Sequence, residues 1–409
     1  MEAFSYAYAI PYLAIFLVFV VLLFWEFRQL NAGKEPQYIR WIAIIVFLIF
    51  FGLRGYVYTD WAIYAPLFEK LPTIGEGGLS KVLSTDFSEE FLTDVSVGKA
   101  GLELGFVYFT VFFKSIINNY FAFVFTNTLI DILLLNIFLK RYSKYYVLSI
   151  ILFMVFGGYF LEFNLLRNIK SILLFLVSLK YLQEKRLVPY VLINVLGFFF
   201  HSSAIVFFPL YFILNKQWPQ WLIWSIFIVG NIIFLLHIKY LESITVTLAD
   251  LMGGRMGVKT RLYFAIDFYS QAYGLGLGYI ERVVTFLVII LSQKKLKEQN
   301  ANNLIFINCF LIYFIIYFFF SEIMVAVQRL SVLFVFAYWI LYPELLFSIK
   351  KSINKWIFVV VLLVFSTLKI IQTNSNIGSR YDNLLFGIES IEDRNIKMYN
   401  NYDALFKEE

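Results

Sequence analysis

Six arginines in this chain lie either near the ends of apolar stretches, where hydrocarbon would give way to water, or in the glycine-rich segment 239–278. They are Arg54, Arg167, Arg255, Arg261, Arg282 and Arg329. A guanidinium group keeps its charge at any working pH, and its planar fork of donors matches the oxygens of a phosphate. These residues therefore predict a pyrophosphate site, with Arg54, Arg167 and Arg329 as the principal ligands because each stands at an end or a break of an apolar run.

Three further residues are candidates for proton transfer: Asp60, Glu103 and His201. A general base needs a pKa not far from the operating pH. A free imidazole titrates near ~6.5, and partial burial raises the pKa of a carboxyl group, so the choice among the three stays open. The competing interpretation is structural: an arginine can cap a helix, Glu162 can pair with Arg167, and a histidine can be a hydrogen-bonded interior residue.

Several classes of site are missing from the sequence. We find no P-loop, dinucleotide fingerprint, HExxH or GxSxG motif in a suitable context. Two histidines and one cysteine, Cys309, argue against a zinc site and against a disulfide. We therefore expect no metal and no cofactor. The net charge of +6 is spread over short loops and requires no nucleic-acid partner.

Composition identifies the solvent of this protein as lipid. Of 409 residues, 61% are hydrophobic and only 15% are charged, and the mean hydropathy is +0.76. Such a chain has too much apolar surface for a soluble domain, and spanning segments must satisfy their own backbone hydrogen bonds. We predict an all-α polytopic membrane protein with about 11–13 transmembrane or re-entrant helices. The amino-terminus lacks the basic region of a cleaved signal peptide, so the first apolar run should remain as a helix.

The distribution of lysine and arginine predicts the topology. The first helix should cover Tyr8–Trp25, and the second should cover Ile39–Leu53 and end at Arg54. Basic gaps near residues 28–40, 140–144, 180–186, 294–297 and 350–355 should be cytoplasmic, which places the amino-terminus outside. The loop 54–102 then lies outside, and its seven acidic residues against four basic ones agree with that side.

In two stretches the number of visible apolar runs does not match the number of membrane crossings that the predicted sides of the flanking loops require. The run from Glu103 to Ile117 is short and charged, which favours a re-entrant or interfacial segment. The number of membrane crossings agrees with the predicted sides of the loops if the run from Val188 to Leu214 folds into two short arms that bend at Phe200-His201-Ser202-Ser203. Irregular backbone at membrane depth is tolerated only beside protein or water, so the bend predicts that His201 faces a cavity.

The remaining chain completes a single transmembrane domain, residues 1–371, followed by an extracytoplasmic polar tail, residues 372–409. A glycine-rich, cationic outer loop is expected at 239–278, and the tail should become helical after Glu389. The other predicted helices are Trp221–Leu236, Tyr279–Leu291, Leu304–Phe320, Val325–Leu346 and Trp356–Ile371.

The order of short motifs in this chain resembles the EpsG family of bacterial exopolysaccharide polymerases, relatives of the Wzy O-antigen and capsule polymerases. The motifs are FGLRGYVYTD, ELGF from Glu103, FNLLRNIKS, FFHSSAIVFFPL and the late Arg329. The resemblance runs from about residue 10 to residue 385. Lys170 departs from it, because the family often has a small residue at that place.

The resemblance implies a bundle of the GT-C-like or Wzy type and a metal-independent glycosyl transfer at the outer face of the cytoplasmic membrane. A growing glycan on undecaprenyl pyrophosphate would be the donor, and a lipid-linked repeat unit would be the acceptor. The bilayer, a flippase and a chain-length regulator would be its partners. Two alternatives remain: a flippase for lipid-linked oligosaccharides, which would also need cations for pyrophosphate, and a membrane O-acyltransferase, which would use a histidine.

Overall fold

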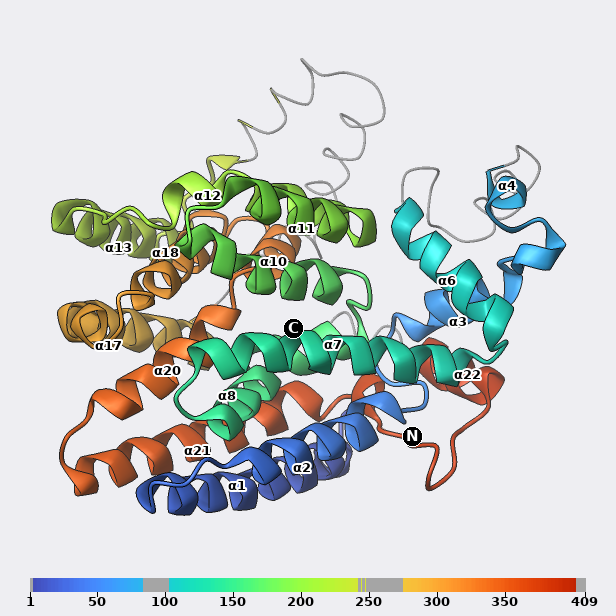
Figure 1. Cartoon of the computed structure of the whole chain (residues 1–409), viewed down its shortest axis with the longest axis horizontal. Coiled ribbons are helices and arrows are strands. Elements are labelled where there is room, and N and C mark those ends of the chain that lie inside the picture. The colour runs from blue at the N-terminus through green and yellow to red at the C-terminus, as the bar shows by residue number, and fades with distance from the viewer. Residues whose placement is uncertain (1–2, 84–102, 242–243, 245–246, 248–274, 402–409) are drawn as a thin grey trace. The chain divides into compact units, whose positions relative to one another are not determined.

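The computed structural model describes residues 3–83, 103–241, 244, 247 and 275–401 of the chain. The fold consists of two compact units, residues 1–211 with 359–409 and residues 212–358. The described residues form helices and turns, and their β-type pairing is limited to isolated bridges. The chain is therefore an all-α polytopic membrane protein, as its composition predicts (Figure 1).

Four helical segments of the described chain are long and apolar enough to cross a membrane. They are Tyr6–Asn31, Tyr120–Tyr142, Tyr146–Phe163 and Ser352–Asn374. Six apolar helical segments are shorter: Gln37–Gly52, Leu104–Ile116, Leu187–Phe200, Ser202–Ile213, Gln220–Leu235 and Asn303–Phe319. A straight crossing takes about 20 residues, so much of this chain consists of segments that are tilted, broken or shorter than a full span.

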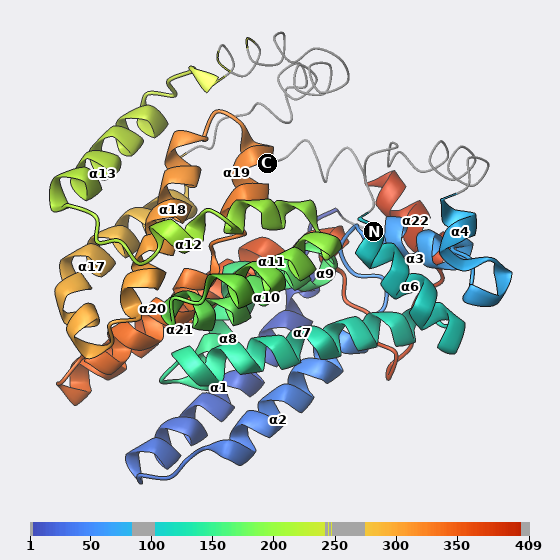
Figure 2. The same cartoon turned by 45° about the horizontal axis from the view of Figure 1, so that its top comes forward.

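The interior of the first unit is formed around one helix that is apolar on every side. This helix, α8 (Tyr146–Phe153), has all eight residues buried, as expected for a helix without a polar face. The helices of this unit that precede and follow it include α1 (Ile10–Asn31), α2 (Gln37–Phe47), α7 (Tyr120–Tyr142), α9 (Tyr159–Phe163), α10 (Asn168–Gln183) and α11 (Leu187–Phe200). Figures 1 and 2 show α1 beside α2, and α10 beside α11.

A smaller group of helices in the same unit presents two of the predicted site residues. It comprises α3 (Trp61–Lys70), α4 (Gly78–Val82) and α6 (Leu104–Ile116). Apolar side chains that include Phe106, Phe123 and Leu166 pack between these helices, α7 and the turn before α10. The ammonium group of Lys114 donates to the carbonyl oxygens of Glu69 and Leu71, at 2.6 and 2.7 Å, and thereby ties α6 to the end of α3.

The second unit contains α13 (Gln220–Leu235), α17 (Leu277–Gln299), α18 (Asn303–Phe319), α19 (Met324–Ser331) and α20 (Phe336–Ser348). Its interior is aromatic: the rings of Phe227 and Phe286 stack at 4.6 Å, and those of Phe314 and Phe318 at 4.1 Å. The amide of Asn308, inside α18, donates to the carbonyl oxygens of Leu214 and Lys216, both at 2.8 Å.

Most predicted helices are present, and one is wrong. The run from Val188 to Leu214 is bent as predicted: α11 ends at Phe200, His201 is extended, and η5 (Ser202–Phe207) and α12 (Leu210–Ile213) follow. The tail is helical after Glu389, as α22 (Ile391–Asn400). The run predicted as one helix from Val325 to Leu346 is instead broken into α19 and α20.

Candidate functional site

Arg167 and Glu103 form a short ion pair in the first unit. Nη1 of Arg167 lies 2.5 Å from Oε2 of Glu103, and both side chains are mostly buried. Arg167 is the residue before α10, and Glu103 is the residue before α6. Two helix beginnings thus bring together a predicted phosphate ligand and a predicted base that are 64 residues apart in the sequence.

The hydroxyl and the ring of Tyr64 also contact the guanidinium group of Arg167. Nε of Arg167 donates to the hydroxyl of Tyr64 at 3.0 Å, and the rings of Tyr64 and Phe106 lie about 6 Å from its central carbon. Burial alone lowers the pKa of Arg167, but Tyr64 and Glu103 outweigh it and the net shift is upward. Burial also raises the pKa of Tyr64 to about 12. At neutral pH the arginine is therefore charged and the tyrosine is protonated.

Glu103 connects this arginine to the bend that contains His201. Its second oxygen, Oε1, accepts a hydrogen bond from the backbone N–H of Ser202 at 2.9 Å. His201 is half-buried and has extended backbone angles, which end α11 and start η5. One carboxylate therefore fixes the distance between the cation at the start of α10 and the imidazole at the bend.

The hydrogen bonds of His201 bear on which ring nitrogen carries the proton. Nδ1 lies 2.8 Å from Oγ of Ser203 and 3.1 Å from the N–H of Ser203. Oγ of Ser203 is also 2.9 Å from Oδ1 of Asn168, an atom that can only accept. If the hydroxyl of Ser203 donates its hydrogen to Asn168, its oxygen accepts from Nδ1–H of His201. The proton of the neutral imidazole is then on Nδ1, and Nε2 is the basic nitrogen. If Nδ1 accepts from the backbone N–H, the proton lies on Nε2.

Asp60 lies near enough to this group for its charge to help raise the pKa values of Arg167 and Tyr64. It precedes α3, and its backbone is held by a side chain from the turn between α9 and α10. Oδ1 of Asn164 accepts from the N–H groups of Thr59 and Asp60, at 3.0 and 3.2 Å. We refer to Arg167, Glu103, Tyr64, Asp60 and His201 as the Arg167 cluster.

Arg54 is buried in the first unit and binds oxygens of the protein itself. Nη1 donates to the carbonyl of Phe51 at 2.5 Å and to Oγ1 of Thr128 at 3.0 Å, and Nη2 donates to the carbonyl of Glu162 at 2.7 Å. The ring of Phe163 lies 5.3 Å from its central carbon. These contacts tie the end of η2 (Leu48–Gly52) to α7 and α9. A role of Arg54 in phosphate binding stays a prediction.

The pairing expected for Glu162 is wrong. Its carbonyl binds Arg54, and its carboxylate accepts a long hydrogen bond from Thr128 at 3.5 Å, whereas Arg167 pairs with Glu103. The sequence expectation had relied on the short distance along the chain between Glu162 and Arg167. The actual partner comes from a different helix.

The same interior contains an ion pair that the sequence reasoning missed. Nζ of Lys170, in the first turn of α10, lies 3.0 Å from Oδ2 of Asp131 in the middle of α7, and both are almost fully buried. Asp131 carried a usable signal, because an ionisable residue inside a 23-residue apolar helix needs a partner. Tyr64, Asn168 and Ser203 carried no such signal, since nothing in their spacing distinguishes them from ordinary polar residues.

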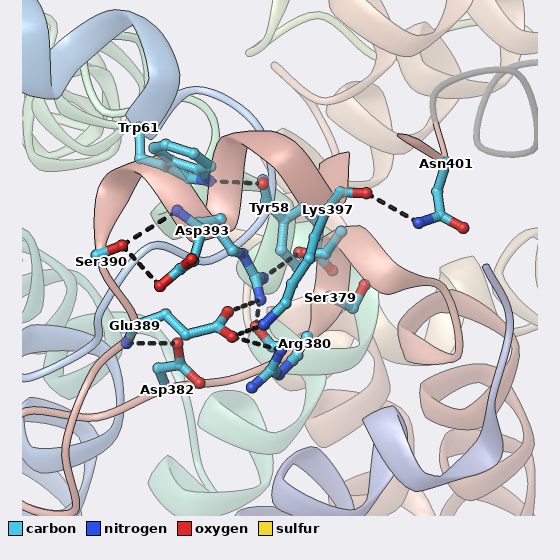
Figure 3. Close-up of polar contacts among 12 residues, drawn as sticks. Tyr58, Trp61, Ser379, Arg380, Asp382, Glu389, Ser390, Asp393, Lys397 and Asn401 are labelled. Carbon is cyan, nitrogen blue, oxygen red and sulfur yellow. Dashed lines mark hydrogen bonds and ion pairs between the residues drawn. The ribbon is translucent and has the colours of Figure 1, made fainter. Parts of the chain in front are cut away.

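The described part of the carboxy-terminal tail, residues 372–401, is folded and packs against the segment that carries Arg54. Backbone hydrogen bonds join Gly55 to Asp382 at 2.9 Å and Tyr58 to Gly378 at 2.8 Å. Figure 3 shows Tyr58 and Trp61 next to the tail. In the tail, the carboxylate of Glu389 accepts a hydrogen bond from Nη1 of Arg380 at 2.8 Å and another from Nζ of Lys397. The polar composition of the tail gave no indication of this contact.

The other predicted arginines are placed as follows. Arg282, in α17 of the second unit, donates to the hydroxyl of Tyr313 at 2.9 Å and to the carbonyl of Gly278 at 2.7 Å, and lies over the ring of Tyr317. Arg329 is exposed in the last turn of α19, in the same unit. Arg255 and Arg261 lie outside the described residues.

No group of three His, Cys, Asp or Glu side chains that could hold a metal occurs in the part of the chain that the structure describes. Comparison with curated proteins and with solved structures gave no match. A family model with the description EpsG family matches residues 37–384. The matched range includes Arg54, the Arg167 cluster and Arg329. Because it covers well over half of the sequence, the chain belongs to the EpsG family.

Proposed function

We propose that this protein is a polysaccharide polymerase of the outer face of the cytoplasmic membrane. It transfers a growing glycan from undecaprenyl pyrophosphate to a sugar hydroxyl of a lipid-linked repeat unit. Membership of the EpsG family supports an exopolysaccharide polymerase. The observation that carries the finer proposal is the double hydrogen bonding of Glu103, which holds the cation of Arg167 and the bend at His201 in one group.

The reaction exchanges one bond at an anomeric carbon for another. The acceptor hydroxyl oxygen forms a bond to the anomeric carbon of the donor, and the bond from that carbon to the pyrophosphate oxygen breaks. The hydroxyl proton passes to a base, and undecaprenyl pyrophosphate leaves with the bonding electrons. The step therefore needs positive charge placed in advance at the leaving oxygen and a basic atom near the acceptor.

Arg167 is assigned to the leaving group. It is charged at every working pH because its neighbours raise its pKa, and the hydroxyl of Tyr64 and the carboxylate of Glu103 fix the plane of its guanidinium. A fork held in one orientation loses little conformational freedom when it binds two phosphate oxygens. Arg54 and Arg329 remain further candidates for this role.

His201 is assigned as the base, with Asp60 and Glu103 as the alternatives. The chain of contacts from Nδ1 to Ser203 to Asn168 leaves Nε2 as the basic nitrogen when the hydroxyl of Ser203 donates to the amide. Glu103 is the weaker alternative, because both of its oxygens already accept hydrogen bonds. Asp60 is the other alternative, and its charge is among those that raise the pKa of Arg167.

The test is an extension assay with purified protein in nanodiscs, a lipid-linked repeat unit, and a gel of product lengths. Arg167→Ala should remove the product ladder. The matched control is Arg186→Ala, because Arg186 is a solvent-exposed arginine after the other end of α10, and this variant should extend normally. A wild-type protein that moves the lipid-linked unit between leaflets without lengthening it would overturn the proposal in favour of a flippase.

A further inference from the structure

The tail carries an apolar turn that its sequence-based description as polar does not explain. Asn383 and Gly387 form an isolated bridge, and the N–H of Phe386 donates to the carbonyl of Asn383 at 2.9 Å. Gly387 has a φ of 96°, a conformation that suits glycine. At the tip of this turn Leu385 is 59% exposed and Phe386 is 89% exposed. Adjacent large apolar side chains at such exposure mark a contact surface.

Hydrogen bonds attach the turn to the end of an apolar helix. The N–H of Leu384 donates to the carbonyl of Leu53 at 2.8 Å, and the amide of Asn383 donates to the carbonyl of Ile49 at 2.9 Å. The hydroxyl of Tyr381 donates to the carbonyl of Phe50 at 2.7 Å. The turn therefore lies beside the point where α2 and η2 end.

Two other apolar helices each have one end beside this part of the tail. Phe4, just before α1, bridges to Asn376, just after α21 (Ser352–Asn374). The hydroxyl of Tyr12, in the first turn of α1, donates to the carbonyl of Ser379 at 2.6 Å. The start of α1, the end of α21 and the end of η2 thus meet around residues 376–384. Ends of apolar helices mark the boundary between hydrocarbon and headgroups, so the turn lies at that depth.

The exposed face of α2 leads to the turn. Trp41 and Ile45 of α2 and Ile49 of the following η2 are exposed and lie four residues apart, which places them on one side of the helical segment Gln37–Gly52. A row of exposed apolar side chains on a membrane helix faces lipid. The turn is bonded to the backbone of Ile49, the last of the three, so its apolar tip continues the lipid-facing row at its interfacial end.

The two ends of the turn are held in place by charged contacts. Arg380 and Glu389 pair at 2.8 Å (Figure 3). Arg394 donates to the carbonyl of Arg380 at 2.6 Å. In Figure 1 the red segment before α22 projects as a loop. A tip held at a fixed base presents its apolar side chains in one direction and loses little freedom on insertion.

We propose that the turn of Leu384, Leu385 and Phe386 inserts into the interfacial layer of the bilayer, in the leaflet where α1 begins. There the turn contacts the part of the acyl chains that lies next to the headgroups of ordinary membrane lipids. Because the turn is bonded to Leu53 and its flank to Gly55, the anchor also fixes the depth of the segment that carries Arg54. The inference does not depend on the reaction that the protein catalyses.

The test measures the depth of residue 386 in a bilayer. In a Cys309→Ser background, Phe386→Cys is labelled with the fluorophore NBD, and the protein is placed in nanodiscs that contain lipids with spin labels at a shallow or a deep acyl position. Cys309 is the only cysteine of the chain and is buried, so its replacement leaves one reactive site. The matched control is Glu392→Cys, an exposed residue in the first turn of α22.

We expect the label at residue 386 to be quenched at least twofold more by shallow spin-labelled lipid than the label at residue 392, and to resist quenching by aqueous iodide. Leu385→Cys should behave in the same way, which provides a second site if Phe386→Cys folds poorly. Equal quenching of both positions by iodide would overturn the proposal. A label at 386 that is protected from iodide and from spin-labelled lipid would also overturn it, in favour of a contact with a second copy.

Discussion

Nζ of Lys170 lies 3.0 Å from Oδ2 of Asp131, inside the first unit, with both charges removed from solvent. Lys170 also donates to the carbonyl of Leu166 at 3.1 Å. The pair joins the first turn of α10, which Arg167 precedes, to the middle of α7. The departure of Lys170 from the small residue that the family resemblance implies is thus compensated by an acidic residue on the facing helix.

Removal of one partner of this pair should destabilise the protein. Asp131→Ala leaves an uncompensated buried ammonium group, which costs about 3–5 kcal/mol of unfolding free energy. Thermal unfolding in detergent should show a clearly lower midpoint for Asp131→Ala and for Lys170→Ala. The double variant Asp131→Leu with Lys170→Met keeps the volume without the charges and should recover most of the loss. Single variants that unfold at the wild-type temperature would contradict a structural role for the pair.

Product formation should depend on the planar shape of the Arg167 guanidinium as well as on its positive charge. Arg167→Lys keeps the positive charge but loses the planar fork, so product formation should fall by about 10²-fold or more, as for loss of one preorganised donor. Glu103→Gln should weaken both the arginine contact and the contact with Ser202. Extension assays at matched protein levels check both results. Wild-type rates in Arg167→Lys would mean that the arginine serves only to join helices.

The bend at His201 could be predicted because a local signal marks it. Arg54 and Arg167 stand at the ends of apolar runs in the sequence, but the burial of Arg54 against carbonyl oxygens of the protein could not be predicted. A polar sequence interrupts the apolar run at Phe200–Ser203, and each arginine stands where apolar residues stop. The bounds of α13 and α18 follow from the same contrast between apolar and polar residues, whereas α1 continues to Asn31, six residues past the predicted end at Trp25. Periodicity and interruption are properties of neighbouring residues, so they are readable from one sequence.

The break between α19 and α20 could not be predicted, because no glycine or proline marks residues 332–335. Pro343, the conspicuous helix breaker of this run, lies inside α20. The chain at 332–335 instead forms turns, with the N–H groups of Leu333 and Phe334 donating to the carbonyls of Leu330 and Ser331.

Contacts between distant segments were equally hidden. Glu103 and Arg167 are 64 residues apart, and the tail binds a segment more than 300 residues earlier, through Tyr381 and Asn383. Most of the tail's contacts with this segment use backbone groups, which every residue possesses. A single sequence therefore indicated the residue types of the site but neither the partner of Arg167 nor the docking of the tail.

The topology prediction places residues 54–102 and the tail outside the cytoplasmic membrane. Single cysteines at Glu76, Lys144 and Lys350 in a Cys309→Ser background test it, since all three residues are exposed. An impermeant maleimide applied to intact cells should label residue 76, whereas residues 144 and 350 should react only after the membrane is opened. Labelling of residue 144 in intact cells would reverse the assignment.

The assignment of His201 as the base predicts a pH dependence. A neutral imidazole accepts a proton and an imidazolium cannot, so activity should fall as the pH drops below ~6.5, the value of a free imidazole. His201→Gln should fold, bind the lipid-linked donor and fail to extend it. Product ladders measured across the pH range provide the result. Near-normal ladders from His201→Gln would move the assignment to Asp60 or Glu103.

Asn168 offers the sharpest test, because its amide oxygen accepts from the Ser203 hydroxyl that contacts Nδ1 of His201. Asn168→Asp places a carboxylate where the amide oxygen accepts from Oγ of Ser203 at 2.9 Å. A nearby negative charge favours the imidazolium and raises the pKa of the histidine, so the acid limb of the pH–rate profile should shift to higher pH. Asn164→Asp is the matched control, since Asn164 binds Thr59 and Asp60 instead. A limb that stays in place in Asn168→Asp and moves in Asn164→Asp would identify Asp60 as the titrating base.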